Sequence, residues 1–186
     1  MIIGLMGYAQ SGKDTVANIL VEEYGYTRVA FADKIREFLY EIDPGIPMTN
    51  GTQVAVVGLQ NLVDEVGWDD AKQHPNVRAL LQNTGVGART LFGEKFWVAQ
   101  ALTNVHFTQN VVITDVRFVN EAESIKKYDN AQLWRVTRPG VNPVNLHISE
   151  TELDGYKEDL SLDNRGTIEE LELLVRSTME SLVSVN

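Results

Sequence analysis

The chain alternates short apolar runs with stretches in which apolar residues recur at helical spacing. Residues 2–6 are apolar and Gly7 follows them, a pattern typical of a buried parallel strand that ends in a turn. Between Val16 and Tyr24 the spacing indicates a helix, and Gly25 is suited to end it. The opening of the chain therefore predicts strand, loop and helix.

The same alternation continues further along the chain. A second strand is expected over residues 28–31, and a helix over residues 35–42, which Pro44 and Gly45 terminate. Residues 111–114 are again apolar and predict a third buried strand.

Two capping-box patterns indicate helix starts in the second half of the chain. Asn120 with Glu123 is the first, and Thr167 with Glu170 is the second. After the second pattern an apolar stripe at helical spacing runs to Leu182, which predicts a last amphipathic helix.

Strands that alternate with helices favour an α/β fold. With a further strand expected over residues 133–136, we predict a three-layer P-loop NTPase fold, in which helices flank a parallel sheet and ligands bind at the carboxyl ends of its strands. The 186 residues are expected to form a single domain. Its core would comprise residues 1–47 and 108–186, with a helical, glycine-interrupted, acceptor-binding insertion at 48–107 and a small polar lid at 138–160.

Composition narrows the range of partners. A net charge of −10 argues against sequence-independent binding to a nucleic-acid polymer, because that affinity needs clustered Lys and Arg. The absence of cysteine excludes disulfides and thiolate chemistry. The chain starts without a basic leader and has no apolar run of membrane-spanning length, so we expect a cytoplasmic protein without a membrane partner. Assembly as a homodimer stays open.

The first glycine-rich turn carries the strongest motif. Four residues separate Gly7 from Gly12 and Lys13 follows, the spacing that lets backbone N–H groups wrap a polyphosphate while the lysine reaches its outer oxygens. The strand before the turn and the helix after it supply the required context. The alternative is a turn that merely closes a βα unit. The residues expected to bind ATP here are Gly7, Ala9, Gln10, Ser11, Gly12, Lys13, Asp14 and Thr15.

Asp14 departs from the usual Ser or Thr after the lysine. A carboxylate at this position can bind Mg²⁺ directly or through water, so we assign the metal to Asp14 and Thr15 jointly. Asp115, at the end of a predicted strand, occupies the place of a further acid for the metal. The alternatives are a helix cap for Asp115 and a surface ion pair for Arg117.

Phosphoryl transfer between two anionic substrates needs several cations besides the lysine. Each candidate cation could equally be a solvated surface charge. Trp97 could stack on a base, although core packing is the default for an aromatic residue at this spacing. The candidate cations are Lys34, Arg36, Arg78, Arg89, Arg117 and Arg138.

Taken in order, several fragments resemble the bacteriophage-type deoxynucleoside monophosphate kinases of the P-loop nucleotide kinase superfamily. The resemblance covers most of the chain. Its fragments are residues 11–15 (SGKDT), 31–34 (FADK), 81–85 (LQNTG) with Arg89, 96–98 (FWV), 114–121 (TDVRFVNE), 135–140 (RVTRPG) and 147–150 (HISE).

This resemblance implies that the γ-phosphate of ATP moves to a deoxynucleoside monophosphate with Mg²⁺ as cofactor, in a small-molecule enzyme that supplies precursors for DNA synthesis. It implies catalytic roles for Lys13, Arg117 and Arg138, and ATP contacts from Asn164 and Gly166. The acceptor site implied by the resemblance comprises Phe31, Lys34, Arg78, Gln82, Arg89, Trp97, Asp115, Arg117 and Glu121.

Two other functions remain open at this point. One is another P-loop small-molecule kinase, similar to dephospho-coenzyme A kinase. The other is a nucleotide-dependent switch or binding module that uses ATP without a second substrate. An arginine-bearing insertion favours a kinase, because a kinase needs an acceptor pocket whereas a switch needs loops that face a partner. The preferred base and sugar, and the extent of lid closure, are also open.

Overall fold

The computed structural model describes residues 1–50, 53–103, 105, 109–144 and 147–184. The chain forms two compact units. The first contains Met1–Ala30 and Leu102–Asn186, and the second contains Phe31–Ala101. The second unit thus includes the helix that follows residue 30, which was predicted to be part of the core.

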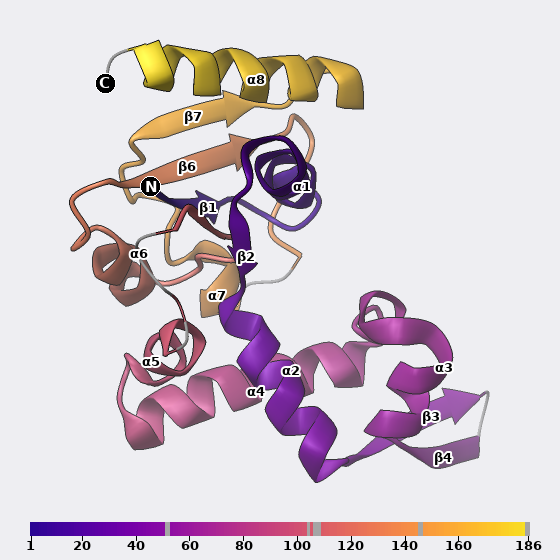
Figure 1. The fold of residues 1–186 in the computed structure, drawn as a ribbon. Coiled ribbons are helices and arrows are strands. Elements are labelled where there is room, and N and C mark those ends of the chain that lie inside the picture. The colour runs from indigo at the N-terminus through magenta and orange to yellow at the C-terminus, as the bar shows by residue number, and fades with distance from the viewer. Residues whose placement is uncertain (51–52, 104, 106–108, 145–146, 185–186) are drawn as a thin grey trace. The chain divides into compact units, whose positions relative to one another are not determined.

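A five-stranded parallel sheet forms the centre of the first unit, with strand order β2-β5-β1-β6-β7 (Figure 1). In β1, Ile3 is in register with Val112 on one side and with Gln132 on the other. The sheet confirms the predicted parallel α/β architecture. Its strands are β1 (Ile2–Met6), β2 (Thr27–Val29), β5 (Val111–Ile113), β6 (Ala131–Thr137) and β7 (Leu160–Asp163).

Helices cover both faces of this sheet. Ile3 and Leu5 of β1 share one core with residues of α1 (Lys13–Tyr24) and α8 (Ile168–Ser184). Trp134 in β6 is completely buried in that core. Gly4 points to the opposite face, where α6 (Val119–Ile125) packs so closely that a Cβ atom on Gly4 would lie 2.9 Å from Ile125 Cδ1. The unit therefore has the expected three layers.

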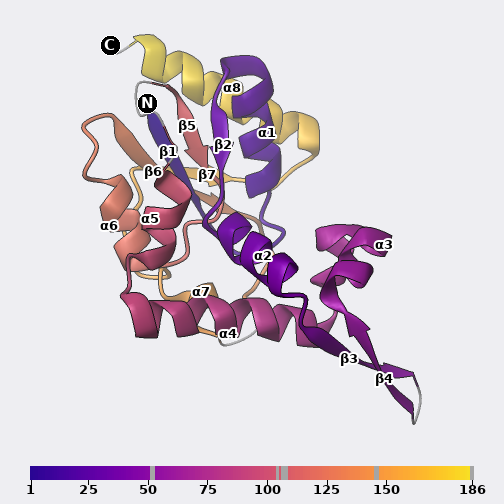
Figure 2. The same cartoon turned by 60° about the horizontal axis from the view of Figure 1, so that its bottom comes forward.

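The second unit has its own core and combines helices with a β-hairpin (Figure 2). Leu39, Leu59 and Val77, from three different helices, are buried together in that core. The hairpin is antiparallel, with Met48 opposite Ala55. The elements are α2 (Phe31–Ile42), β3 (Gly45–Asn50), β4 (Gln53–Gly58), α3 (Leu59–Ala71), α4 (Pro75–Phe92) and α5 (Phe96–Leu102).

The hairpin corrects the prediction that the insertion is helical from its start. Val54 and Val56 alternate along β4, a period of two that suits a strand, and both side chains are exposed. The second predicted strand is also shorter than expected. β2 ends at Val29, opposite the last residue of its partner β5, and Phe31 already begins α2.

Three further details near the helices differ from the prediction. The capping acid of α6 is Glu121, whose carboxylate accepts from the backbone N–H of Phe118; Asn120 lies inside the helix. β7 was not predicted. The Thr167 and Glu170 capping box is confirmed, but Ile168 in the predicted apolar stripe is exposed.

No helix within the described ranges is both long and apolar enough to span a membrane.

Candidate active site

The predicted phosphate loop joins the end of β1 to the start of α1. Gly7, Gln10 and Gly12 have φ angles of 135°, 66° and 109°, values that residues other than glycine rarely adopt. A Cβ atom on Gly7 would collide with the carbonyl oxygen of Val136 in the neighbouring strand. The two motif glycines are therefore required by the loop's own geometry.

Asn164 holds this loop from the far end of the chain. Its buried side-chain amide donates to the carbonyl oxygen of Ser11 at 2.9 Å, and its own N–H donates to Thr137 at 2.8 Å. A Cβ atom on Gly12 would lie 2.6 Å from Asn164 Nδ2. Asn164, predicted to contact ATP, thus supports the predicted phosphate loop directly. Gly166 lies beside the α8 cap, where a Cβ atom would overlap the Glu170 carboxylate.

Lys13 lies at the first turn of α1, and its ammonium group folds back to donate to Tyr8 O at 2.7 Å. Burial, and secondly the nearby Arg117 guanidinium, lower the pKa of Lys13 to about 8; Asp14, Asp115 and Glu150 oppose this shift. The structure therefore brings the predicted lysine, arginine and two metal-site acids into one electrostatic neighbourhood.

These acids suit a magnesium ion that arrives with a nucleotide. Within the described ranges no three His, Asp or Glu side chains group to hold a metal. Mg²⁺, however, typically takes one or two carboxylates together with substrate phosphates and water. Asp14 and Asp115 near Lys13, with the hydroxyl of Thr15 on the same helical turn, are hard oxygen donors that fit this requirement.

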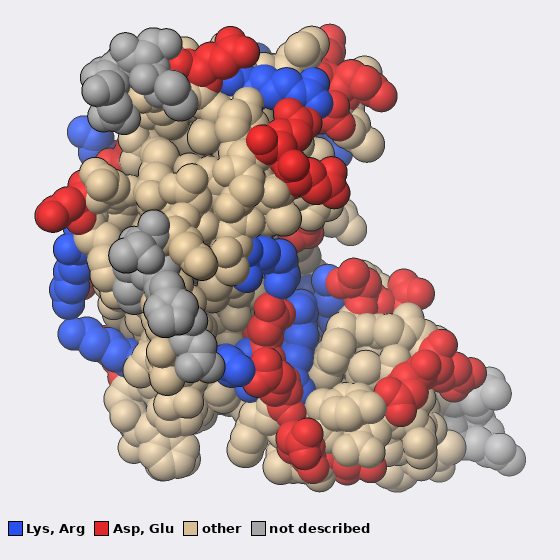
Figure 3. Space-filling model, in the orientation of Figure 1, with Lys and Arg blue, Asp and Glu red and all other residues tan. Residues whose placement is uncertain are grey.

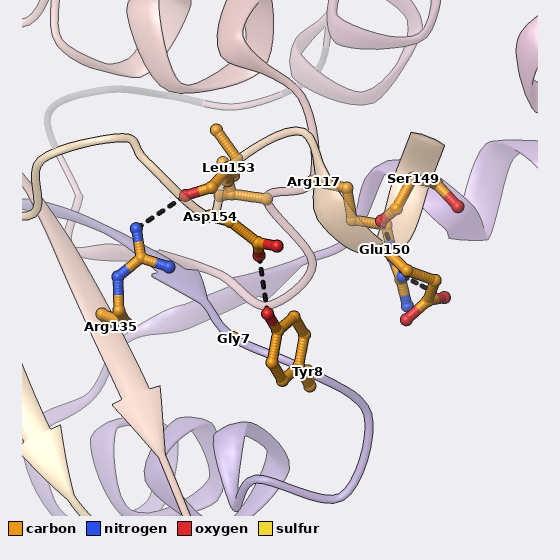
Figure 4. Close-up of a pocket in the computed structure, with 9 residues that line it drawn as sticks. Gly7, Tyr8, Arg117, Arg135, Ser149, Glu150, Leu153 and Asp154 are labelled. Atoms are coloured by element: carbon orange, nitrogen blue, oxygen red, sulfur yellow. Dashed lines mark hydrogen bonds and ion pairs between the residues drawn. The ribbon is translucent and has the colours of Figure 1, made fainter. Parts of the chain in front are cut away.

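A short segment around α7 (Ile148–Thr151) lies against the phosphate loop (Figure 4). Arg117 Nη1 donates to Glu150 Oε1 at 2.8 Å and to Ser149 O at 3.2 Å. Tyr8 donates its hydroxyl proton to Asp154 Oδ1 at 2.8 Å, a bond that raises the pKa of Tyr8. The segment and the loop together border a pocket. It is lined by Gly7, Tyr8, Val116, Arg117, Arg135, Ser149, Glu150, Leu153 and Asp154.

Sequence reasoning missed roles for Tyr8, Glu150 and Asp154. Tyr8 occupies an unconstrained position of the loop motif, and Glu150 appears only within a fragment of the family resemblance. Glu121 accepts hydrogen bonds from the backbone N–H groups of Arg117 and Phe118, so its carboxylate orders the turn that carries the arginine.

A wider cavity of about 230 Å³ opens beside the loop in the same unit. Arg138, Thr137 and Val141 help to line it, and Arg138 is exposed. Arg135 borders it as well, but its guanidinium is bound to Glu158 at 2.9 Å and to the carbonyl oxygens of Leu153 and Tyr156. Arg138 is thus the more accessible of the two cations.

Six candidate acceptor residues belong to the second unit. On α4, Arg78, Gln82 and Arg89 are spaced so that they share one helix face. Lys34 on α2 pairs with Glu37 at 2.6 Å. Trp97 is buried, and its indole N–H donates to Gly85 O at 2.9 Å, which is the packing role given above as its default. Phe31 is also buried.

Comparisons with known proteins identify relatives of this chain. Residues 43–175 match the deoxynucleotide monophosphate kinase family. A protein of Acanthamoeba polyphaga mimivirus, named "Putative deoxynucleotide monophosphate kinase", is 30% identical over 199 residues, covering 100% of both chains.

Similarity to solved structures is more distant. Shikimate kinase from Aquifex aeolicus is 14% identical, with 98% of each chain covered and a TM-score of 0.48. Dephospho-CoA kinase from Campylobacter jejuni is 13% identical, with 97% of this chain and 96% of that chain covered and a TM-score of 0.45. Since one family matches more than half of the chain and a relative matches it over its full length, the chain belongs to the deoxynucleotide monophosphate kinase family.

Proposed function

We propose that the protein transfers the γ-phosphoryl group of ATP to a deoxynucleoside 5′-monophosphate, giving the diphosphate and ADP. The observation that carries this proposal is the loop from Gly7 to Lys13, in which the partly buried ammonium group of Lys13 lies near Arg117 and Asp115. In a family of deoxynucleotide monophosphate kinases, such a site suits ATP as the phosphoryl donor.

In the proposed reaction an oxygen of the acceptor phosphate attacks the γ-phosphorus of ATP. The bond from that phosphorus to the β,γ-bridging oxygen breaks, and the oxygen leaves on ADP. The acceptor phosphate is already ionised at neutral pH, so the step requires no general base. The chain's task is therefore to position two anions and to stabilise the charge of the transition state.

The described residues divide this task between them. Backbone N–H groups of the loop and the start of α1 would bind the polyphosphate, and Lys13 would exchange its bond to Tyr8 O for a phosphate oxygen. Arg117 and Arg138 would contact the transferred group. Mg²⁺, held by Asp14, Thr15 and Asp115 together with the nucleotide, would neutralise negative charge on the phosphates.

A coupled assay of ADP release, run with each deoxynucleoside and ribonucleoside monophosphate in turn, tests the proposal. We expect at least one deoxynucleoside monophosphate to accelerate ADP release well above the rate with ATP alone, and chelation of Mg²⁺ to abolish the acceleration. If no monophosphate has this effect, the chain is instead an ATP-dependent switch or a kinase for another acceptor.

Replacing the loop lysine tests the mechanism. Lys13→Ala should lower kcat at least about 10²-fold, because it removes a preorganised cation from the transferred phosphoryl group. Its thermal unfolding should stay cooperative, since the ammonium group is not part of the apolar core. Turnover close to that of the wild type in folded Lys13→Ala would refute the mechanism.

A further inference from the structure

Glu150 is an acid that the fold alone does not explain. Its side chain is only 3% exposed, although it belongs to a helix of four residues. Oε1 accepts from Arg117, whereas Oε2 is buried and accepts no hydrogen bond from the residues that the structure describes. Burying a carboxylate with one unsatisfied oxygen is costly. Replacing a whole buried ion pair with apolar residues is often neutral or stabilising, so a benefit in function explains Glu150 better than a benefit in stability.

The partner of Glu150 is held from one side only. Both contacts from the α7 segment, to Ser149 O and to Glu150 Oε1, use the same nitrogen, Nη1 of Arg117. At the other end of the residue, its backbone N–H donates to Glu121 at 2.8 Å. Neither Nε nor Nη2 donates to any residue in the described ranges. The edge of the guanidinium formed by Nε and Nη2 is therefore not used by the described residues, and its geometry suits a phosphate bound through two hydrogen bonds.

The exposed fractions of the two side chains agree with a guanidinium that is held on one edge and accessible on the other. The side chain of Arg117 is 36% exposed, whereas that of Glu150 is 3% exposed, so the carboxylate lies behind the guanidinium. Both residues line the pocket that Gly7 and Tyr8 of the phosphate loop also line (Figure 4).

We propose that Glu150 is a positioning residue for catalysis: its buried carboxylate fixes Nη1 of Arg117 so that the Nε and Nη2 edge faces the phosphoryl group in transfer. The inference rests on the proposed kinase reaction. Glu150 itself does not touch the substrate; it keeps a long and otherwise mobile side chain in one rotamer before the nucleotide binds. Holding a charged group in place before the reaction lowers the barrier, because no reorganisation is then needed in the transition state.

A double-mutant cycle on Glu150 and Arg117 tests the inference. Glu150→Gln, which keeps the shape but removes the charge, should lower kcat between about 10-fold and 100-fold, the loss expected when a catalytic group moves by about 1 Å. The KM values for ATP and for the acceptor should change less than about threefold, because the contact matters mainly in the transition state. In the Arg117→Ala background the same substitution should lower kcat much less, since Glu150 is proposed to act mainly through the arginine and has only the smallest of the carboxylate effects on Lys13.

Glu152→Gln is the matched control. Glu152 lies at the end of the same helix and accepts from the backbone N–H of Val119 at 2.9 Å, a bond that a glutamine oxygen can keep. We expect its kcat to equal that of the wild type. Glu150→Asp keeps the charge but shortens the reach to Nη1; it should also lower kcat, and it serves as the test if Glu150→Gln does not fold.

Three results would overturn the inference while wild-type turnover persists. One is an unchanged kcat in folded Glu150→Gln. Another is a loss confined to KM, and the third is an equal loss from Glu150→Gln in the wild-type and Arg117→Ala backgrounds. If wild-type protein phosphorylates no nucleoside monophosphate, the proposed function fails instead, so the two failures are distinguishable.

Discussion

At the scale of single residues, the most unusual group is the ammonium of Lys13. It is partly buried, and a guanidinium lies near it, so the structure disfavours its charged form more than water does. Three carboxylates limit the effect, and the pKa of Lys13 settles at about 8 instead of 10.5. The candidate phosphate-binding cation of the unliganded protein therefore deprotonates just above neutral pH.

This shift predicts the alkaline side of the pH profile. Below pH 8 the amine is protonated and able to stabilise phosphate, and above pH 8 the cation is lost, so kcat/KM for ATP should fall as pH rises through about 8. The measurement is kcat/KM against pH from 6 to 10. Residual activity of Lys13→Arg is the control, because a guanidinium stays charged over the whole range and should not show this decline. A wild-type profile that is flat up to pH 10 would contradict the predicted deprotonation.

Glycine positions give a second prediction at this scale. Gly7→Ala should lower the free energy of unfolding by more than Gly25→Ala, although both glycines have positive φ angles. At Gly25, where a Cβ atom would meet nothing within 4 Å, only the backbone strain of about 1–2 kcal/mol applies. At Gly7 the Cβ atom would also displace the backbone of Val136. Denaturant unfolding of both variants measures the difference, and equal losses would contradict the close approach.

The positions of Gly7, Gly12 and Lys13 could be predicted from sequence because the loop motif is local. The roles of Tyr8 and Glu150 could not, because each depends on a residue far along the chain. Asp154 is 146 residues from Tyr8, and Glu150 is 33 residues from Arg117. Neither distance leaves a periodic signal in the sequence.

At the scale of elements, the turn after β5 and the α7 segment depend on each other. Arg117→Ala leaves the Glu150 carboxylate buried without its partner, and should lower the free energy of unfolding by about 1–3 kcal/mol. Glu150→Gln in the same chain should restore much of this loss, because it removes the unpaired charge. Urea unfolding of the two single variants and the double variant gives the comparison. A double variant that is no more stable than Arg117→Ala would show that the buried charge has no such cost.

Elements with strong periodicity were predicted well, and elements defined by pairing were not. β1, α1 and α8 follow from apolar spacing and from glycine and capping residues near them. β7 has four residues of mixed polarity and exists because it pairs with β6, register Val136 to Leu162. The β3–β4 hairpin likewise depends on cross-strand pairing, and it lies where glycines interrupt an expected helical pattern.

At the scale of the whole molecule, the candidate donor and acceptor residues separate between the two units. The candidate ATP residues lie in the first unit, and six of the candidate acceptor residues lie in the second. Substitutions in the second unit should therefore affect acceptor use selectively.

Arg89→Ala should raise the KM for the deoxynucleoside monophosphate at least about tenfold, the loss expected when a charge-assisted contact to phosphate is removed. The KM for ATP should change less than about threefold. Initial rates with each substrate varied in turn provide the measurement. Lys95 is an exposed cation in the turn just before α5 in the same unit, so Lys95→Ala is the control and should change neither constant. Equal increases in both KM values would refute the acceptor assignment of Arg89.

The surface charge of the protein affects how the two proposed substrates approach it. Acidic residues outnumber basic ones by 26 to 16, and in Figure 3 they gather over α8 and the nearby end of α1, and also over α2 and α3 of the second unit. A nucleotide therefore approaches a protein of its own sign, and the cations near the phosphate loop must provide the local attraction.

The amide of Asn164 has a consequence for biosynthesis. The loop near the start of the chain is held by a side chain 153 residues later, and glycine at position 12 is fitted closely against the same amide. While the ribosome is still adding the last strand, a nascent chain lacks this clamp, although it already contains every residue of the motif. We expect such partly synthesised chains to hold the loop less firmly, so that the proposed binding of ATP begins only after Asn164 has been added and has left the ribosome.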